Sequence, residues 1–353
     1  MRRRGAAHRP CLRPDPTDPR AETAAGQTKD QATDTEPIMN RPIVVLLAAA
    51  CAGVLSAAAP ETGDRQTPQA PAPGVAEFDD AAPAALEVKR APTGHVLVRC
   101  SVNASEPGWF IFDTGAGICV ISTPHVKPLG LRAAGEIEAV GIGGGESAGL
   151  VQADSVTVGP LTLRDHPMLV TDLSFLKPHL GEEIQGVLGY GVLARSVAEI
   201  DLAEPAVRLH RAGEPGLASL PWEELVLIGR VPAVHARFEG HDGVFRLDTG
   251  ANGSVTFHEP AVRTLGLLDG RDVDDTKVGG VGGFVAAKRG NLAWFEIGGV
   301  RTEGVPALFA IEPKGSFADE SRAGNIGVDL LKPFVMYFDY ADGRVAFVPR
   351  AGG

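Results

Sequence analysis

The sequence is short of aromatic residues and of basic charge, and each shortage narrows the possible folds and functions. Only 6% of the 353 residues are Phe, Trp or Tyr, whereas 44 are Gly, a balance that favours short strands and tight turns over long helices. The net charge of −11 argues against a nucleic-acid partner, which requires a basic face. The nine His residues show no metal-type spacing, so the sequence predicts neither a metal site nor a cofactor.

Cysteine is also scarce, with four residues in the chain. Only Cys100 and Cys119 fall in the part that we expect to fold. A disulfide between them is conceivable in an exported protein, but each lies in an apolar strand pattern. Buried free thiols are therefore the favoured interpretation.

Long apolar runs are absent from the N-terminal region as well. Residues 1–38 are polar and predict a disordered segment, or an extension upstream of a true start at Met39. Residues 39–59 have the pattern of a signal peptide, with Arg41 followed by an apolar stretch too short for a comfortable membrane span. We therefore expect a periplasmic or secreted protein; a membrane tether through this segment and a lipid on Cys51 stay open. Residues 60–85 are rich in Pro, Ala and acid and predict a flexible linker.

The remaining chain contains an internal duplication. "FIFDTGAG" at 110–117 and "FRLDTGAN" at 245–252 are offset by 135 residues. Three further landmarks recur in the same order at nearly the same offset: 140–145 with 279–284, 185–193 with 324–331, and 197–211 with 335–350. Such a series predicts two copies of one unit, at residues 86–211 and 218–350.

Each copy has the alternating and turn-rich pattern of an all-β fold. Short helices are expected only near 124–131 and 259–267. "GESAG" at 145–149 matches the nucleophile elbow of hydrolases, but a strand-like segment follows where that motif needs a helix, so a hairpin is predicted. His95 and His235 occur at matching places in the first strand of each copy, which suggests paired structural roles.

Two acidic tetrapeptides at equivalent places predict a shared site. An Asp at the end of an apolar strand is costly to desolvate, and a pseudo-twofold axis would bring Asp113 to face Asp248. Two carboxyl groups in contact share a proton, so one acts as a base on water while the other polarises a carbonyl. The adjoining Thr and Gly residues would join the two loops and let them approach: Thr114, Gly115, Thr249 and Gly250.

These motifs resemble the retropepsin-like aspartic proteases, and more narrowly the bacterial exported aspartyl protease family, in which two such units lie in one chain. The resemblance implies two acid-protease β-barrel lobes in tandem, related by a pseudo-twofold axis, in a monomer that is an intramolecular pseudo-dimer. It makes Asp113 and Asp248 the catalytic pair. It also assigns two substrate-covering flaps, with tips at Gly141, Ile142, Gly143 and Gly144 and at Gly280, Val281, Gly282 and Gly283.

The expected function is that of an aspartic endopeptidase acting on a peptide or an unfolded protein. The alternative is an envelope peptide-binding or sensor protein of the same fold with weak or no turnover. Two departures from the family pattern motivate the alternative. Copy one has Tyr190-Gly191 after its apolar-apolar-Gly segment, and copy two has Asn325 in place of an aliphatic residue.

Overall fold

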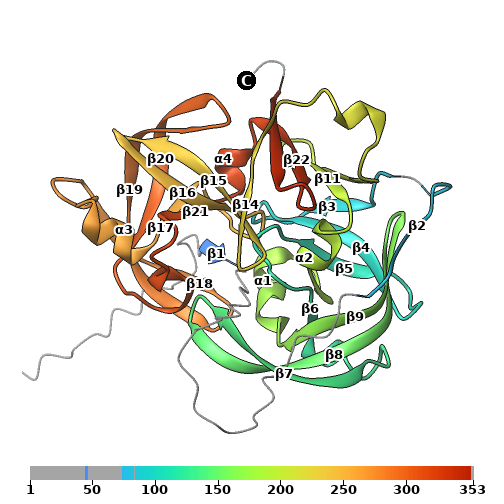
Figure 1. The fold of residues 1–353 in the computed structure, drawn as a ribbon. Coiled ribbons are helices and arrows are strands. Elements are labelled where there is room, and N and C mark those ends of the chain that lie inside the picture. Colours follow the sequence, from blue (N-terminus) through green and yellow to red (C-terminus); the bar gives the residue numbers. More distant parts are fainter. Residues whose placement is uncertain (1–43, 47–73, 83, 351–353) are drawn as a thin grey trace, which may run out of the picture. The chain divides into compact units, whose positions relative to one another are not determined.

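The computed structural model describes residues 44–46, 74–82 and 84–350. The predicted N-terminal extension at 1–38 lies outside the described residues, as does most of the predicted signal peptide at 39–59. No helix within the described ranges is long and apolar enough to cross a membrane. Strands dominate and the helices are short, which confirms the predicted all-β class with two retropepsin-like lobes (Figure 1).

Lobe 1 is one sheet in the strand order β2-β9-β6-β10-β5-β4-β8-β7, with β3 paired to β4. Its strands are β2 (Ala76–Phe78), β3 (Val88–Arg90), β4 (Val96–Val102), β5 (Gly108–Phe112), β6 (Val120–Ser122), β7 (Arg132–Gly141), β8 (Gly144–Val158), β9 (Leu161–Thr171) and β10 (Gly186–Leu188). Its short helices are η2 (Thr123–His125), η3 (Ser174–Leu176), α1 (Lys177–Leu180) and α2 (Tyr190–Leu193).

Lobe 2 repeats this plan in the order β1-β18-β19-β20-β17-β21-β16-β15-β14. Its strands are β1 (Val44–Leu46), β14 (Val226–Ile228), β15 (Val231–Phe238), β16 (His241–Leu247), β17 (Val255–Phe257), β18 (Asp274–Gly280), β19 (Gly283–Ile297), β20 (Val300–Ala310) and β21 (Gly324–Ile326). Its short helices are α3 (Glu259–Thr264), η5 (Gly315–Ala318) and α4 (Val328–Leu331).

The two lobes share their central strands and differ at the edges, where β2 pairs with β9 in lobe 1 and β1 pairs with β18 in lobe 2. In lobe 1, β10 lies between β5, to which it is parallel, and β6, to which it is antiparallel. In lobe 2, β21 has the same relation to β16 and β17. Because β5 and β16 carry the two acidic tetrapeptides at their ends, this repeated arrangement supports both acidic loops in the same way.

A third sheet joins the lobes. It runs in the order β12-β11-β22-β23-β13, and β11 pairs with β22. Its members are β11 (Val197–Asp201), β12 (Ala206–His210), β13 (Trp222–Glu224), β22 (Phe334–Asp339) and β23 (Arg344–Pro349), with η4 (Pro215–Leu217) before β13. The sequence predicts both hairpins, but their mutual pairing is a feature of the folded chain. We call this the joint sheet.

The predicted linker at 60–85 extends too far toward the C-terminus. Strand β2, inside that range, pairs antiparallel with β9. Arg211 fixes the same segment, because it forms an ion pair with Asp80 and lies 5.0 Å from the ring centroid of Phe78. A Pro- and acid-rich composition does not prevent a short edge strand when a partner strand is available.

The strand bounds and the pairing of residues across strands test two predictions from the sequence, one for "GESAG" and one for His95 and His235. "GESAG" lies inside β8, with strand on both sides, as the hairpin interpretation requires. The matched placement of His95 and His235 is wrong. Leu97 lies opposite Ile111 and Ala233 opposite Arg246, so His95 corresponds to Val231 and His235 to Arg99.

Phe338 in β22 tests how tightly the joint sheet connects the lobes. Its side chain is fully buried in an apolar cluster that contains residues of both lobes. We expect Phe338→Ala to lower the free energy of unfolding by about 3–5 kcal/mol, because it leaves a large cavity. Denaturant unfolding of the full chain should still show one transition, because both lobes contribute strands to the joint sheet.

Phe175→Ala is the control, since that ring is 46% exposed, and it should cost less than about 1 kcal/mol. Separate transitions for the two lobes would contradict the structural role given to the joint sheet.

Candidate active site

Asp113 and Asp248 follow the last residues of β5 and β16, and both side chains are fully buried. The backbone N–H of Asp113 donates to the carbonyl of Leu188 at 2.9 Å, and that of Asp248 to Ile326 at 3.0 Å. The segments that follow β10 and β21 therefore support the two loops from beneath. A second backbone contact also occurs in both lobes. The N–H of Tyr190 donates to the carbonyl of Ala116, and the N–H of Val328 donates to the carbonyl of Ala251, each at 2.9 Å.

The two loops are joined by a reciprocal set of hydrogen bonds between the threonines. The hydroxyl of Thr114 donates to the carbonyl of Leu247 at 2.8 Å and accepts from the N–H of Thr249 at 3.0 Å. In the same way, the hydroxyl of Thr249 donates to the carbonyl of Phe112 at 2.8 Å and accepts from the N–H of Thr114 at 3.0 Å. All four bonds are buried, so they hold the lobes in register where the acidic residues lie.

Gly115 and Gly250 let the two carboxyl groups approach. A Cβ atom on Gly115 would lie 2.5 Å from Oδ1 of Asp248, and one on Gly250 would lie 2.3 Å from Oδ2 of Asp113. Both distances are far below a van der Waals contact, so any side chain at either position would push the opposite carboxyl group away. Each glycine N–H also donates to Oδ1 of the Asp in its own loop, at 2.7 and 3.1 Å.

The electrostatics of Asp113 and Asp248 are those of a pair that shares one proton. Burial raises the pKa of Asp113 well above its usual range, and the negative charge of Asp248 raises it further. Burial also raises the pKa of Asp248, while nearby Arg246 opposes that rise. The Oδ2 atoms of Asp113 and Asp248 have no hydrogen-bond partner among the described residues. A single proton held by the pair relieves the cost of burying two negative charges side by side.

Arg246 is a charged residue that sequence reasoning missed. It is 1% exposed, and its Nε and Nη1 atoms have no hydrogen-bond partner among the described residues. Burial lowers its pKa to about 10, so the guanidinium stays positive at neutral pH. The negative charges of Asp248, Asp319 and Asp113 act in the opposite direction and raise the pKa of Arg246. The sequence does contain a signal for this residue, because Arg246 interrupts the apolar run of the second copy at the position where the first copy has Ile111.

Asn325, one of the two departures in the sequence, belongs with Arg246. The two residues lie opposite each other in the β16–β21 register, and Asn325 is 1% exposed. Its Oδ1 atom pairs with Nε2 of His258 at 3.1 Å. Burial, and then the charge of Arg246, lower the pKa of His258 to about 4, so this imidazole is neutral at pH 7. Asn325 is thus a polar neighbour of a buried cation rather than a defect in the core.

Two further residues that contact the loops come from distant parts of the chain. Nε2 of His95, at the start of lobe 1, lies 2.9 Å from the carbonyl oxygen of Gly250 in lobe 2. The Tyr340 hydroxyl, near the end of the chain, donates to the carbonyl of Thr114 at 3.1 Å. Burial raises the pKa of Tyr340 well above its usual range, so it remains a donor. Neither residue has a local sequence signal for this contact.

The two expected flap tips meet each other. Gly141 and Gly144 flank the turn between β7 and β8, and Gly280 and Gly283 flank the turn between β18 and β19. The N–H of Gly143 donates to the carbonyl of Val281 at 3.2 Å. A Cβ on Gly143 would lie 1.5 Å from the carbonyl oxygen of Gly282, so only glycine permits this crossing.

Each tip residue packs into the opposite lobe. Ile142, from flap 1, is fully buried in a lobe 2 cluster that includes Ala251, Val285 and Phe317. Val281, from flap 2, packs on a lobe 1 cluster that includes Ile111. The structure therefore has both flaps closed.

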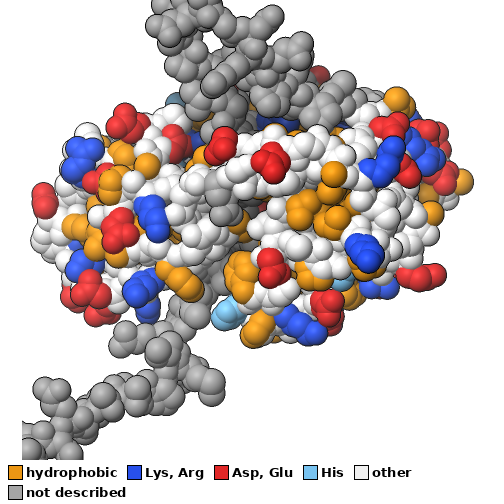
Figure 2. Space-filling model, turned by 90° about the horizontal axis from the view of Figure 1, so that it is seen from below, with side chains coloured by type: hydrophobic (Ala, Val, Ile, Leu, Met, Phe, Trp, Pro, Cys, Tyr) orange, Lys and Arg blue, Asp and Glu red, His pale blue; other side chains and the backbone are white. Residues whose placement is uncertain are grey.

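Basic and acidic side chains are interspersed between apolar patches on the face viewed in Figure 2.

Cys100 and Cys119 are both buried free thiols, as the strand patterns predicted.

Comparison with known proteins identifies the repeated unit. A family model described as aspartyl protease matches the chain twice, at residues 98–192 and 234–330, and each segment contains one Asp-Thr-Gly sequence. No curated protein matches the chain.

Thr114→Val tests the reciprocal bonds between the loops. The substitution keeps the shape but leaves the Leu247 carbonyl and the Thr249 N–H without their partner. We expect a loss of about 2–4 kcal/mol in the free energy of unfolding, measured in denaturant, because buried polar groups without partners are costly. Thr114→Ser retains the hydroxyl and should recover most of the loss. Equal stability of the Val variant and the wild type would show that these bonds do not hold the lobes together.

Proposed function

The chain belongs to the aspartyl protease family, and we propose that it is an aspartic endopeptidase in which Asp113 and Asp248 activate a water molecule. The observation that carries this proposal is the pair of fully buried carboxyl groups, one from each copy, whose pKa values are both raised by burial.

We assign the base to Asp248, because the charge of Arg246 is the largest influence that opposes the rise of its pKa, and the acid to Asp113. Asp248, as the carboxylate, accepts a proton from the water as its oxygen attacks the peptide carbonyl carbon. Asp113, as the acid, gives its proton to the carbonyl oxygen. The resulting diol collapses when the C–N bond breaks: the nitrogen takes the proton that Asp248 accepted, and a diol hydroxyl gives its proton to Asp113, which leaves a carboxylic acid and an amine and restores the pair. Burial supports both tasks, because electrostatic interactions strengthen where bulk water is excluded.

The substrate in this proposal is an extended peptide held against the flap strands by main-chain hydrogen bonds. Ile142 and Val281 must leave their apolar positions before such a peptide enters. Because each tip packs into the opposite lobe, the two flaps must separate before the peptide enters. A peptide or unfolded protein as substrate, action as a single chain, and export from the cytoplasm are parts of the same proposal.

Asp113→Asn and Asp248→Asn test the catalytic roles. Each substitution preserves shape and burial but removes a proton that the mechanism must move. We expect each to reduce kcat/KM by about 10³-fold or more, measured with a library of unstructured peptides. Asp80→Asn, which changes a carboxylate that is 82% exposed, should leave kcat/KM unchanged.

Cleavage at the wild-type rate by either active-loop variant would refute the assignment. Binding of peptides by the wild type without cleavage at any pH would instead identify a peptide-binding protein of the same fold.

Arg246→Met tests how the buried cation tunes the pair. The positive charge lowers the pKa of both Asp113 and Asp248. Removing it raises both pKa values, so Asp248 loses its charge at a higher pH as the solution is acidified. We therefore expect the acidic limb of the kcat/KM profile to move to higher pH.

Arg246→Lys keeps a cation and should show a smaller displacement of the limb. Arg263→Met removes an exposed charge from α3 and serves as the matched control. An unchanged acidic limb in a folded Arg246→Met protein would rule out an electrostatic role for this residue.

A further inference from the structure

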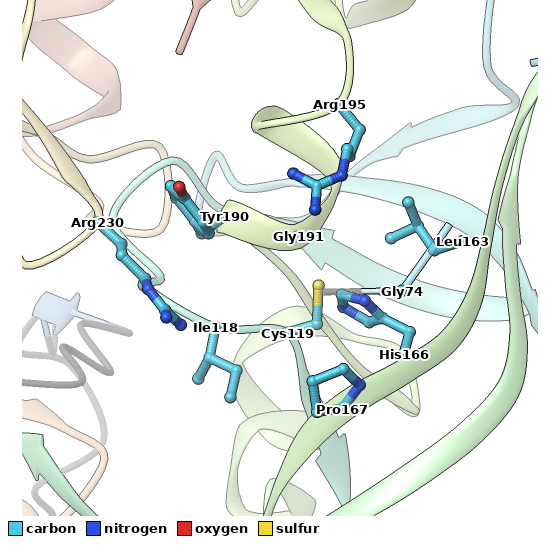
Figure 3. A pocket seen from close by; sticks show the side chains of 11 residues that line it. Gly74, Ile118, Cys119, Leu163, His166, Pro167, Tyr190, Gly191, Arg195 and Arg230 are labelled. Atoms are coloured by element: carbon cyan, nitrogen blue, oxygen red, sulfur yellow. The ribbon is translucent and has the colours of Figure 1, made fainter. Parts of the chain in front are cut away.

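Lobe 1 contains a cavity of about 140 Å³ that is separate from the buried acidic pair. The side chains that give it chemical character are Cys119, His166, Tyr190, Arg195 and Arg230 (Figure 3). The volume is several times the ~30 Å³ that one water molecule occupies in the liquid, so a small polyatomic ligand fits. Arg230 comes from the β14–β15 turn of lobe 2, so both lobes contribute to the cavity wall.

The imidazole of His166 lines this cavity and carries an unpartnered polar atom. The residue is 8% exposed, and its Nε2 atom has no hydrogen-bond partner in the described part of the chain. A buried polar atom of this kind costs free energy unless a partner satisfies it. The thiol of Cys119 is different, because burial raises its pKa and keeps it neutral, while backbone N–H groups at Gly189, Gly191 and Val192 oppose that rise.

The cavity is lined by positive charge without compensating acid. The described residues that line it include Arg195 and Arg230 and contain no Asp or Glu. Arg230 lies over the ring of Tyr190, with its guanidinium carbon 5.4 Å from the ring centroid. Burial, and then the charge of Arg195, lower the pKa of His166 to about 4, so the imidazole is neutral at pH 7. The wall thus combines two guanidinium groups with a neutral imidazole, and all three can donate N–H groups to an anion.

Gly191 makes room for the imidazole in the cavity wall. A Cβ atom there would lie 2.4 Å from Nε2 of His166 and 3.1 Å from Sγ of Cys119. In lobe 2 the equivalent residue is Asp329, whose carboxylate forms an ion pair with Lys332 at 2.6 Å. The glycine that looked like an irregularity of the first copy is thus the residue that allows His166 to lie beside the cavity.

The other cavity residues are also absent from the second copy. By strand register, Cys119 corresponds to Val255 and His166 to Val305, and both valines are buried. Arg195 corresponds to Pro333. The duplicated scaffold therefore has a packed apolar region in lobe 2 where lobe 1 has a polar cavity. A feature that only one copy has is not required by the fold.

We propose that the lobe 1 cavity binds a small oxyanion, either a carboxylate or a phosphate group, between Arg195 and Arg230 and beside the imidazole of His166. Guanidinium groups bind both kinds of oxyanion through charge-assisted hydrogen bonds, which supply affinity as well as orientation. The site is distinct from the peptide cleft and does not depend on peptide hydrolysis.

A bound anion would influence the acidic loop through Tyr190. The N–H of Tyr190 donates to Ala116, three residues after Asp113, and its ring centroid lies 6.2 Å from that of Tyr340. Tyr340 in turn donates to the Thr114 carbonyl. A ligand that orders Arg230 over Tyr190 therefore adds rigidity to two of the contacts that support the loop.

The test is a titration of the full-length Asp113→Asn protein with inorganic phosphate and, separately, with acetate, in a buffer free of other oxyanions. Calorimetry gives the affinity, and NMR of the His166 imidazole reports binding at this place. We expect at least one anion to bind and to raise the pKa of His166, because a negative charge favours the imidazolium. The stronger of the two ligands identifies the source of the oxyanion.

Arg195→Met should weaken binding by about tenfold or more, since it removes a charge-assisted hydrogen bond. Gly191→Asp should abolish binding by filling the cavity and placing a carboxylate inside it. Arg263→Met, on the surface of lobe 2, is the control and should bind like the parent.

Absence of binding by either anion, or equal affinity in the parent and Arg195→Met, would overturn the proposal. Because the parent variant lacks the Asp113 acid, neither result depends on whether the protein is a protease.

Discussion

The reciprocal hydrogen bonds of Thr114 and Thr249 are the interaction on which the site depends. Two buried carboxyl groups repel each other when both are charged, and burial penalises each charge separately. The loops stay together because four buried hydrogen bonds connect them and because Gly115 and Gly250 leave no side chain between them. The unfavourable electrostatics are then relieved by protonation of one member. Acid–base function follows from the same contacts that hold the lobes in register.

The scaffold is symmetric, whereas the charges around it are not. Lobe 2 has the buried Arg246 and its neighbour Asn325 where lobe 1 has Ile111 and Val187. Lobe 1 has the polar cavity around His166 where lobe 2 has valines. A fused chain permits such differences, because each copy can change independently, which identical subunits of a homodimer cannot do. The asymmetry places a buried cation on one side of the acidic pair, and it gives one lobe a pocket that the other lacks.

The sequence predicts much of this arrangement and fails in ways that have physical reasons. The duplicated tetrapeptides, Gly-rich turns and hairpins are local patterns, so they indicate the two lobes, the place of Asp113 and Asp248 and both flap tips. The pairing of β11 with β22 and the contact of Tyr340 with Thr114 join residues more than a hundred positions apart, and no local pattern encodes them. Arg246 fits a half-exposed strand by alternation alone, and its burial becomes visible only when β21 is packed beside it.

The joint sheet also has a consequence for how the chain folds. Strands β11 and β12 precede lobe 2 in the chain, but β11 pairs with β22, which follows lobe 2. Contacts between residues so distant in sequence form late, because closing a long loop costs conformational entropy. One edge of β11 therefore stays unpaired until the hairpin of β22 and β23 is available. The acidic loop of lobe 1 likewise lacks its Tyr340 contact until then, so the site assembles only after lobe 2 and this hairpin have been synthesised.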